Sequence, residues 1–301
     1  MNLKQIVTST LIIAFCNTGY AQKKKALVIG IDGLQFNQIQ NANTPNIDGF
    51  NIKRGFTGGR YGTASEQVTL SGPGWITILT GVWADQHGIT SNDGTKLSKA
   101  PSIFSFIRDH NKEAYTTSIS TWKEINLILK NDLYKTNFAT VGGSDYLSTD
   151  LIVNQIEDYA PDFSFVHLDV VDHAGHEYGF GKVYNEAIEF VDTLIGKMMT
   201  AITHRRQKYY EDWLVIIVTD HGRDDKGFSH GAQKTNQKTI FIGMNAEGND
   251  YFKNSDDGRK IDSMKDLETL IPQTSVVPTV LKHLEIPIED NWKLDGQSLI
   301  D

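Results

Sequence analysis

Four runs of mainly apolar residues, each six residues long, constrain the fold of this chain more than any other feature of its sequence. Runs of this length without polar alternation predict strands that are buried on both faces, as in a parallel sheet. The predicted strands are 26–31, 163–168, 213–218 and 239–244, and helical periodicity predicts helices over 103–110, 146–159, 183–202 and 275–284. Strands that alternate with helices predict an α/β protein, a three-layer αβα sandwich around a mostly parallel central sheet.

Acidic residues follow three of these runs. Asp32 comes directly after the first run, Asp169 and Asp172 follow the second, and Asp220 with His221 follows the third. The carboxyl ends of parallel strands meet at one edge of a sheet, and open α/β sheets bind their ligands there. The sequence therefore predicts that these acids gather at one edge of one sheet.

Histidines near these acids indicate a metal centre. Asp172 and His176 are four residues apart and would share one face of a helical turn, and His230 lies in a Ser-His-Gly segment. Each motif alone could equally be a hydrogen-bonded turn, but together they converge on one sheet edge. The six candidate ligands are Asp32, Asp172, His176, Asp220, His221 and His230. Such a nitrogen and oxygen set suits two divalent metal ions with open positions; Zn²⁺ fits best, and manganese or iron would use similar ligands.

Ser71 is the candidate nucleophile. Gly72-Pro73-Gly74 indicates a tight turn, and the residues after it favour a helix that ends near Gly81. We expect Ser71 just before the helix N-terminus, where backbone N–H groups and the helix dipole favour an anion. A metal ion would further lower the pKa of the hydroxyl. The alternative is that Ser71 only caps the helix.

The first 21 residues have the pattern of a secretory signal peptide. Lys4 supplies the positive charge, residues 6–15 are mainly apolar, and Ala21 is a small residue at the cleavage position. This stretch is shorter than the roughly 20 residues of a spanning helix, so we expect no membrane span after cleavage. A membrane anchor, or lipid attachment at Cys16, is the alternative. We expect a periplasmic or secreted protein in which residues 22–301 form a single domain.

The charge of the chain bears on its partners. The formal net charge is −8, and removal of Lys4 with the signal peptide makes it −9, from 28 basic and 37 acidic residues. This balance argues against binding of a nucleic acid polymer or an anionic membrane, and favours a small-molecule substrate. An anionic substrate would then have to be attracted by a bound cation. The basic run Lys23-Lys24-Lys25 is interpreted as a solvated tail.

Several motifs carry a family resemblance. They include Ile31-Asp32-Gly33, the segment NTPNID at 43–48, DHAGH at 172–176, TDHG at 219–222 and VPTVL at 277–281. In this order they resemble the alkaline phosphatase superfamily, and within it the type I phosphodiesterase/nucleotide pyrophosphatase branch. The resemblance covers most of the chain after residue 21. It implies an alkaline phosphatase-like fold and a two-metal phosphoester hydrolase that works through a phosphoseryl intermediate.

The resemblance also implies residue roles. One metal ion would be held by Asp172, His176 and His230, and the other by Asp32, Asp220, His221 and the nucleophile Ser71. Asn92, 21 residues after Ser71, stands where these families place an asparagine that binds phosphate. The short spacing between His221 and His230 implies that cap insertions in the catalytic domain are small.

Two departures leave the choice between monoester and diester open. Nucleotide pyrophosphatases usually have a threonine nucleophile followed by an aromatic residue, whereas this chain has Ser71 and Gly72. Monoesterases add a basic residue that binds the extra phosphate charge. Lys123 and Arg223 are tentative candidates for that phosphate contact, and for each the alternative is a surface base.

Other functions fit these motifs less well. A sulfatase would need a modified nucleophile in a motif whose fifth residue is usually Arg, but that position is Trp75. A sugar-phosphate mutase conflicts with the signal peptide, and a non-catalytic metal- or anion-binding protein on the same fold is a further alternative. His87 is interpreted as a turn residue and His167 as a satisfied core histidine. The sequence does not indicate an oligomeric state.

Overall fold

The computed structural model describes residues 22–256 and 258–301, so the expected signal peptide at residues 1–21 lies outside the described residues. The strands are β1 Lys23–Ile31, β2 Asn51–Phe56, β3 Thr116–Ser120, β4 Phe138–Val141, β5 Phe163–Leu168, β6 Glu211–Val218, β7 Thr239–Met244 and β8 Ile271–Pro272. The helices are α1 Ser71–Thr80, α2 Ala84–His87, α3 Ile103–His110, α4 Glu124–Ile128, α5 Lys130–Leu133, α6 Asp145–Tyr159, α7 Val170–Tyr178, α8 Lys182–Tyr209, α9 Thr235–Lys238, α10 Asp250–Asn254, α11 Met264–Leu267 and α12 Val276–His283. None of the helices in these residues is long and apolar enough to cross a membrane.

The strands form one sheet in the order β4-β3-β5-β1-β6-β7-β2-β8. The three strands that carry the predicted acids, β5, β1 and β6, are neighbours and run parallel to one another. Strand β7 is antiparallel to both of its neighbours, β6 and β2. The apolar run at 239–244 was therefore correctly predicted as a strand, but not as a parallel one. It returns from β6 without a long crossover helix, so its direction reverses.

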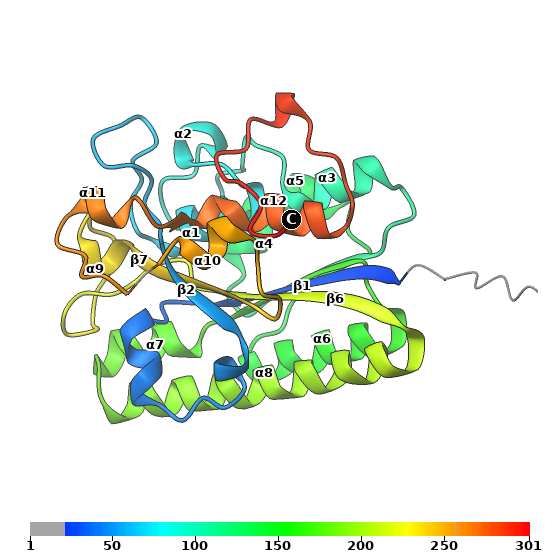
Figure 1. Ribbon diagram of the computed structural model, residues 1–301, viewed down its shortest axis with the longest axis horizontal. Helices are drawn as coiled ribbons and strands as arrows, with labels where there is room; N and C mark the ends of the chain where they lie inside the picture. Colours follow the sequence, from blue (N-terminus) through cyan, green and yellow to red (C-terminus); the bar gives the residue numbers. More distant parts are fainter. Residues whose placement is uncertain (1–21, 257) are drawn as a thin grey trace, which may run out of the picture.

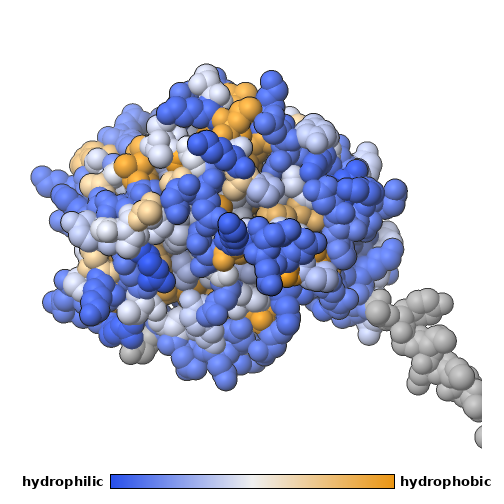
Figure 2. All heavy atoms as spheres, turned by 90° about the horizontal axis from the view of Figure 1, so that it is seen from above, coloured by the Kyte–Doolittle hydropathy of each residue, from blue (hydrophilic) through white to orange (hydrophobic). Residues whose placement is uncertain are grey.

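Helices cover both faces of the sheet, which confirms the three-layer α/β sandwich (Figure 1). Helices α6, α7 and α8 lie on one face, and α1, α3, α4 and α12 lie on the other. Alternate residues of β1 point into the two cores: Val28 packs with the α1 and α12 side, while Leu27 and Ile29 pack with the α8 side. Burial of both faces explains why these strands lack polar alternation. On the side shown in Figure 2, hydrophobic residues form small, separated patches among hydrophilic ones.

The basic run at the start of the described chain is not a tail. Strand β1 begins at Lys23, and Lys25 is buried. The ammonium of Lys25 lies 2.7 Å from the Asp162 carboxylate and donates to the carbonyl of Ala160 at 2.6 Å. Pairing with β6 extends the central strand by these residues, which local sequence could not indicate.

Candidate active site

Strands β5, β1 and β6 deliver their acids to one edge of the sheet. Asp32 follows the last residue of β1, Asp169 follows the last residue of β5, and Asp220 lies two residues beyond β6, with His221 next to it. Asp32 is 1% exposed, and Asp220 and His221 are fully buried. Because these three strands are adjacent and parallel, their carboxylates gather at one buried position. Burying a single unpaired carboxylate there would cost free energy.

Helix α7 presents the fourth and fifth predicted ligands. Its first turn is capped by Asp145, whose two carboxylate oxygens each accept a backbone N–H at 2.8 Å, one from Asp169 and one from Val170. The cap fixes the helix start and therefore the direction of the residues one turn later. Asp172 Oδ2 and His176 Nε2 lie 3.2 Å apart on the same face, as the four-residue spacing predicted.

Three histidines, His176, His221 and His230, direct their Nε2 atoms toward this edge of the sheet, because their Nδ1 atoms contact backbone carbonyls. The Nδ1 atom of His176 lies 2.9 Å from the carbonyl of Phe228, that of His230 lies 2.9 Å from the carbonyl of Thr69, and that of His221 lies 3.1 Å from the carbonyl of Gly222. A carbonyl oxygen can only accept, so each Nδ1 carries the proton. Each Nε2 therefore directs its lone pair into the cluster, the arrangement typical of metal-binding histidines.

The resulting cluster consists of acceptors that face one another. Nε2 of His176 and Nε2 of His230 are 2.9 Å apart although both direct lone pairs toward the gap. Asp220 Oδ2 is buried and has no hydrogen-bond partner among residues 22–256 and 258–301, and it lies 3.3 Å from His221 Nε2. Such contacts repel unless a cation lies between them. The donor set therefore fits bound metal ions.

Two groups of ligand atoms match the predicted metal sets in part. Asp32, Asp220 and His221 offer atoms within 4.8 Å of one another, as do Asp172, His221 and His230. The short distances of His176 to both His230 and Asp172 place it beside the second group. Nitrogen and carboxylate oxygen ligands of this kind suit zinc.

Burial controls protonation in the cluster. Desolvation, together with the charges of Asp32 and Asp172, raises the pKa of Asp220 well above its usual value. Desolvation, with the neighbouring His230, lowers the pKa of His221 to about 3. His221 is thus neutral at physiological pH and able to bind a metal, while the Asp220 carboxylate requires a cation to be stable as an anion.

Ser71 lies next to this cluster. It is the first residue of α1, and the residue before it, Leu70, occupies the cap position, so Ser71 neither precedes the helix nor caps it. Its side chain reaches Asp32 Oδ1 at 3.4 Å and His221 Nε2 at 3.3 Å. Ser71 is therefore in contact with ligands of one predicted metal set, and at a helix N-terminus that favours anions.

A cavity of about 180 Å³ opens over Ser71 and is lined by Asp32, Ser71, Asn92, Trp122, Asp169, Asp172, His173, His176 and His230. Asn92 Oδ1 accepts the backbone N–H of Gly72 at 2.8 Å, which leaves the amide N–H groups of Asn92 as donors. These donors suit a phosphate oxygen bound above Ser71. The structure thus brings together Ser71, Asn92 and all six predicted ligands.

The two tentative phosphate contacts are not in this cavity. Lys123 is exposed and precedes α4, whereas its neighbour Trp122 lines the cavity. Arg223 is fully buried and is bonded to the carboxylate of Asp172 behind the cluster. The alternative reading of Arg223 as a surface base was wrong, because the turn after β6 folds its side chain inward.

Sequence reasoning missed the roles of His167 and Trp75. His167 is buried on β5, as expected of a core histidine, but its Nε2 lies 3.0 Å from Asp32 Oδ2. The indole N–H of Trp75, on α1, donates to the same oxygen at 2.9 Å. A histidine inside a mainly apolar strand was the available signal for His167; Trp75 gave none, because it fits a helix core equally well.

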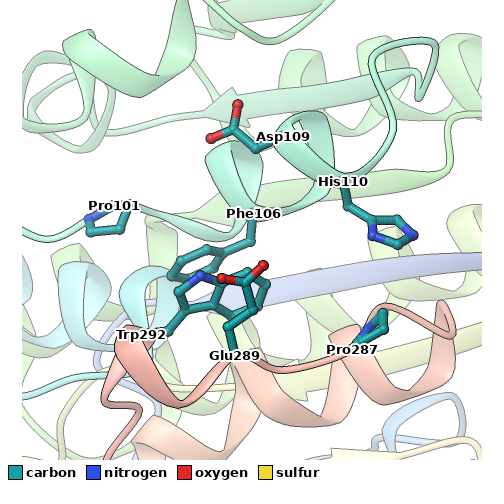
Figure 3. Close-up of a pocket in the computed structure, with 7 residues that line it drawn as sticks. All are labelled: Pro101, Phe106, Asp109, His110, Pro287, Glu289 and Trp292. Atoms are coloured by element: carbon teal, nitrogen blue, oxygen red, sulfur yellow. The ribbon is translucent and has the colours of Figure 1, made fainter.

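A larger hollow of about 510 Å³ lies elsewhere (Figure 3) and is lined by Pro101, Phe106, Asp109, His110, Pro287, Glu289 and Trp292. The rings of Phe106 and Trp292 stack with centroids 4.2 Å apart. His110 also borders a hollow with Lys24 and Asp162, at the amino ends of β1 and β5. We assign the active site to the smaller cavity, because it combines a nucleophile with metal ligands at the carboxyl ends of the strands.

One known family matches most of the chain. The family model described as type I phosphodiesterase / nucleotide pyrophosphatase matches residues 26–104 and 104–241. The bis(5'-adenosyl)-triphosphatase ENPP4 of Bos taurus is 24% identical over 237 residues, which are 68% of this chain and 49% of that protein. The chain thus spans about half the length of this curated relative.

Solved structures share the fold. Murine ectonucleotide pyrophosphatase/phosphodiesterase 5 has a TM-score of 0.51 at 18% identity, over 66% of this chain and 57% of that one. A 2-O GAG sulfatase has a TM-score of 0.61 at 12% identity, over 93% of this chain and 76% of that one.

Proposed function

Because the chain belongs to the type I phosphodiesterase/nucleotide pyrophosphatase family, we propose that it is a two-metal phosphoric ester hydrolase that cleaves phosphodiesters with Ser71 as nucleophile. One observation carries the proposal: three imidazole Nε2 atoms and three carboxylates converge beside the Ser71 hydroxyl. Asp172, His176 and His230 would hold one divalent ion, and Asp32, Asp220, His221 and Ser71 the other, with Zn²⁺ the ion that best suits these donors.

The residues of the chain have separable tasks in this reaction. Bound divalent ions supply a Lewis acid that lowers the pKa of the serine hydroxyl and stabilises the leaving oxygen. Asp32 Oδ1 accepts the Ser71 hydroxyl and orients its oxygen toward the cavity. Ser71 Oγ gives up its proton and attacks phosphorus, the P–O bond to the leaving group breaks with its oxygen taking up one proton to leave as an alcohol, and a phosphoseryl ester forms. Asn92 holds a non-bridging oxygen, and water then attacks phosphorus and releases Ser71, so one water is consumed for each diester cleaved.

The cavity favours a diester over a monoester. A monoester carries one more negative charge than a diester, and monoesterases need a cationic group for it. Among the described residues that line the Ser71 cavity there is no lysine or arginine, and the carboxylate of Asp169 lines it instead. Trp122 offers an apolar surface for the alcohol on the other side of the phosphate. We also propose that the enzyme acts outside the cytoplasm, on the strength of the pattern in residues 1–21.

The test is the ratio of kcat/KM for bis-p-nitrophenyl phosphate to that for p-nitrophenyl phosphate, on Zn²⁺-loaded protein. We expect a ratio well above one, loss of both activities in Ser71→Ala, and no change in the ratio in Lys123→Ala. A ratio well below one, with loss of monoester activity in Lys123→Ala, would instead support a monoesterase. Tight Zn²⁺ binding without turnover would support a non-catalytic metal-binding protein.

A further inference from the structure

A buried arginine lies directly behind one of the metal ligands. Arg223 is fully buried, and its Nη1 atom is bonded to Asp172 Oδ1. Its Nε donates to the carbonyl of Gly227 at 2.5 Å, and its backbone N–H donates to Gln35 Oε1 at 2.6 Å. The guanidinium is thus held through Nη1 and Nε, whereas Nη2 has no hydrogen-bond partner among the described residues, and the charge is directed at a carboxylate of the site.

Two glycines leave the space that the guanidinium fills. A Cβ atom on Gly175 would lie 2.4 Å from both Cζ and Nε of Arg223. A Cβ atom on Gly33 would lie 2.6 Å from Nη1 of Arg223, and Gly33 also has a φ of +60°, which other residues rarely adopt. Gly175 is helical and could otherwise be alanine, the residue that favours a helix most. Its lack of a side chain is therefore explained by Arg223.

The contact fixes how Asp172 faces the cluster. Oδ1 is held by Arg223, while Oδ2 lies 3.2 Å from Nε2 of His176. A carboxylate anchored at one oxygen cannot turn both oxygens toward a bound ion. The arginine also balances one of the three negative charges, which a site made of Asp32, Asp172 and Asp220 would otherwise leave to the ions alone.

We propose that Arg223 is a positioning residue for metal binding: it orients Asp172 as a ligand through one oxygen, and Gly175 is required because it admits the guanidinium. This inference rests on the proposed two-metal function. It assigns a role to Arg223 that is different from substrate binding, since the side chain does not line the Ser71 cavity.

The first test is metal affinity, measured by competition between Zn²⁺-loaded protein and a chromophoric chelator. Loss of a group that orients a metal ligand typically weakens binding about 10–100-fold. We expect this loss at one of two Zn²⁺ positions in Arg223→Met, and a changed visible spectrum of the Co²⁺-substituted variant. Arg223→Lys should recover part of the affinity, because it keeps the charge but not the forked geometry.

A matched control removes a buried arginine elsewhere. Arg205 is 8% exposed and pairs with Glu211, with Nε 3.0 Å from Oε2, where α8 meets the start of β6. Arg205→Met should lower the melting temperature of the metal-free protein, yet leave both Zn²⁺ affinities unchanged. This comparison separates a general loss of stability from a specific loss of metal binding.

Gly175→Ala supplies an independent test that keeps every charge. The new methyl group must displace the guanidinium, so we expect weaker Zn²⁺ binding in the same direction as in Arg223→Met. The double variant should bind no more weakly than Arg223→Met alone, since the methyl group then displaces nothing. This variant also keeps the inference testable if Arg223→Met does not fold.

The outcomes distinguish failure of the role proposed for Arg223 from failure of the proposed function on which that role rests. If the wild-type protein binds no Zn²⁺ and hydrolyses no phosphoester, the proposed function fails. If the wild-type protein binds two ions, and folded Arg223→Met and Gly175→Ala bind them with wild-type affinity, the positioning role of Arg223 is overturned. Additive losses in the double variant would overturn the role assigned to Gly175.

Discussion

The Nε2 atom of His167 lies 3.0 Å from Oδ2 of Asp32, inside the buried end of the sheet. The backbone N–H of Trp122 donates to Nδ1 of His167 at 3.4 Å, so the ring proton is on Nε2 and is donated to Asp32. The indole of Trp75 donates to the same oxygen. Two buried donors thus occupy Oδ2, and Oδ1 is left to face Ser71 and His221.

Removal of the hydrogen bond from His167 to Asp32 should therefore weaken catalysis, although this bond does not involve the substrate. We expect His167→Leu to lower kcat/KM about 10–100-fold, because Asp32 can then rotate away from its ligand orientation. His167→Gln, whose amide can donate near the position of Nε2, should recover part of the loss. Steady-state kinetics on bis-p-nitrophenyl phosphate measure both. Equal activity of His167→Leu and wild type would show that Trp75 alone suffices.

Asn92 should matter for turnover more than for folding. Its oxygen accepts the Gly72 N–H, so Asn92→Asp keeps that contact but replaces the amide donors by a negative charge. Loss of one donor to a developing oxyanion typically costs about 10²–10³ in kcat. We expect Asn92→Ala to lose this much and Asn92→Asp to lose at least as much, with unchanged melting temperatures. A wild-type kcat in Asn92→Asp would remove Asn92 from the phosphate site.

Asp220 should destabilise the metal-free protein and stabilise the metal-bound one. Burial raises the folded-state pKa of Asp220 above the unfolded value of 3.8. The stability linked to this group is therefore present below about pH 4 and is lost as the pH rises through the folded-state pKa. At pH 7.5, metal-free Asp220→Asn should melt above metal-free wild type.

Zn²⁺ should reverse that order. An ion at 100 times its dissociation constant stabilises a protein by about 2.7 kcal/mol. Asp220→Asn lacks an anionic ligand and should gain less from the ion. Melting curves of the wild type and of Asp220→Asn, each recorded with a chelator and with Zn²⁺, give the four melting temperatures needed. An equal Zn²⁺-induced shift in both proteins would exclude Asp220 as a ligand.

His87 should make the fold sensitive to acid. It is fully buried, Nδ1 accepts the Ile89 N–H at 3.0 Å, and Nε2 lies 3.0 Å from Thr77 Oγ1. Desolvation by burial lowers its pKa from 6.5 to about 3. The unfolded state therefore binds the proton more readily, so the stability from His87 is complete above pH 6.5 and falls as the pH drops from there toward 3.

At pH 5 this effect amounts to about 2 kcal/mol for a single group. His87→Asn keeps an acceptor near Nδ1 and removes the titration. Its free energy of unfolding should fall less between pH 7.5 and pH 5 than that of the wild type, as measured by urea denaturation at both pH values. Parallel pH profiles for the two proteins would contradict the assignment.

Local sequence patterns were enough to predict the strands and the helical face that position the site residues. The run at 163–168 became β5 and the pattern at 103–110 became α3 with the same bounds, because burial of these segments depends on their own periodicity. The acids after β1, β5 and β6 met at one edge because parallel neighbours share a direction. The spacing of Asp172 and His176 determined their common face on α7.

Tertiary structure alone decided how the ligands are oriented. The direction of β7 depends on its pairing with β6 and β2, and the burial of Arg223 depends on space left by Gly33 and Gly175. The hydrogen bonds from His167 to Asp32 and from Arg223 to Asp172 each join residues more than 50 positions apart. Residue types and helix or strand periods are local properties, whereas the choice of which oxygen of a carboxylate is free for a metal depends on contacts that form only when the chain has folded.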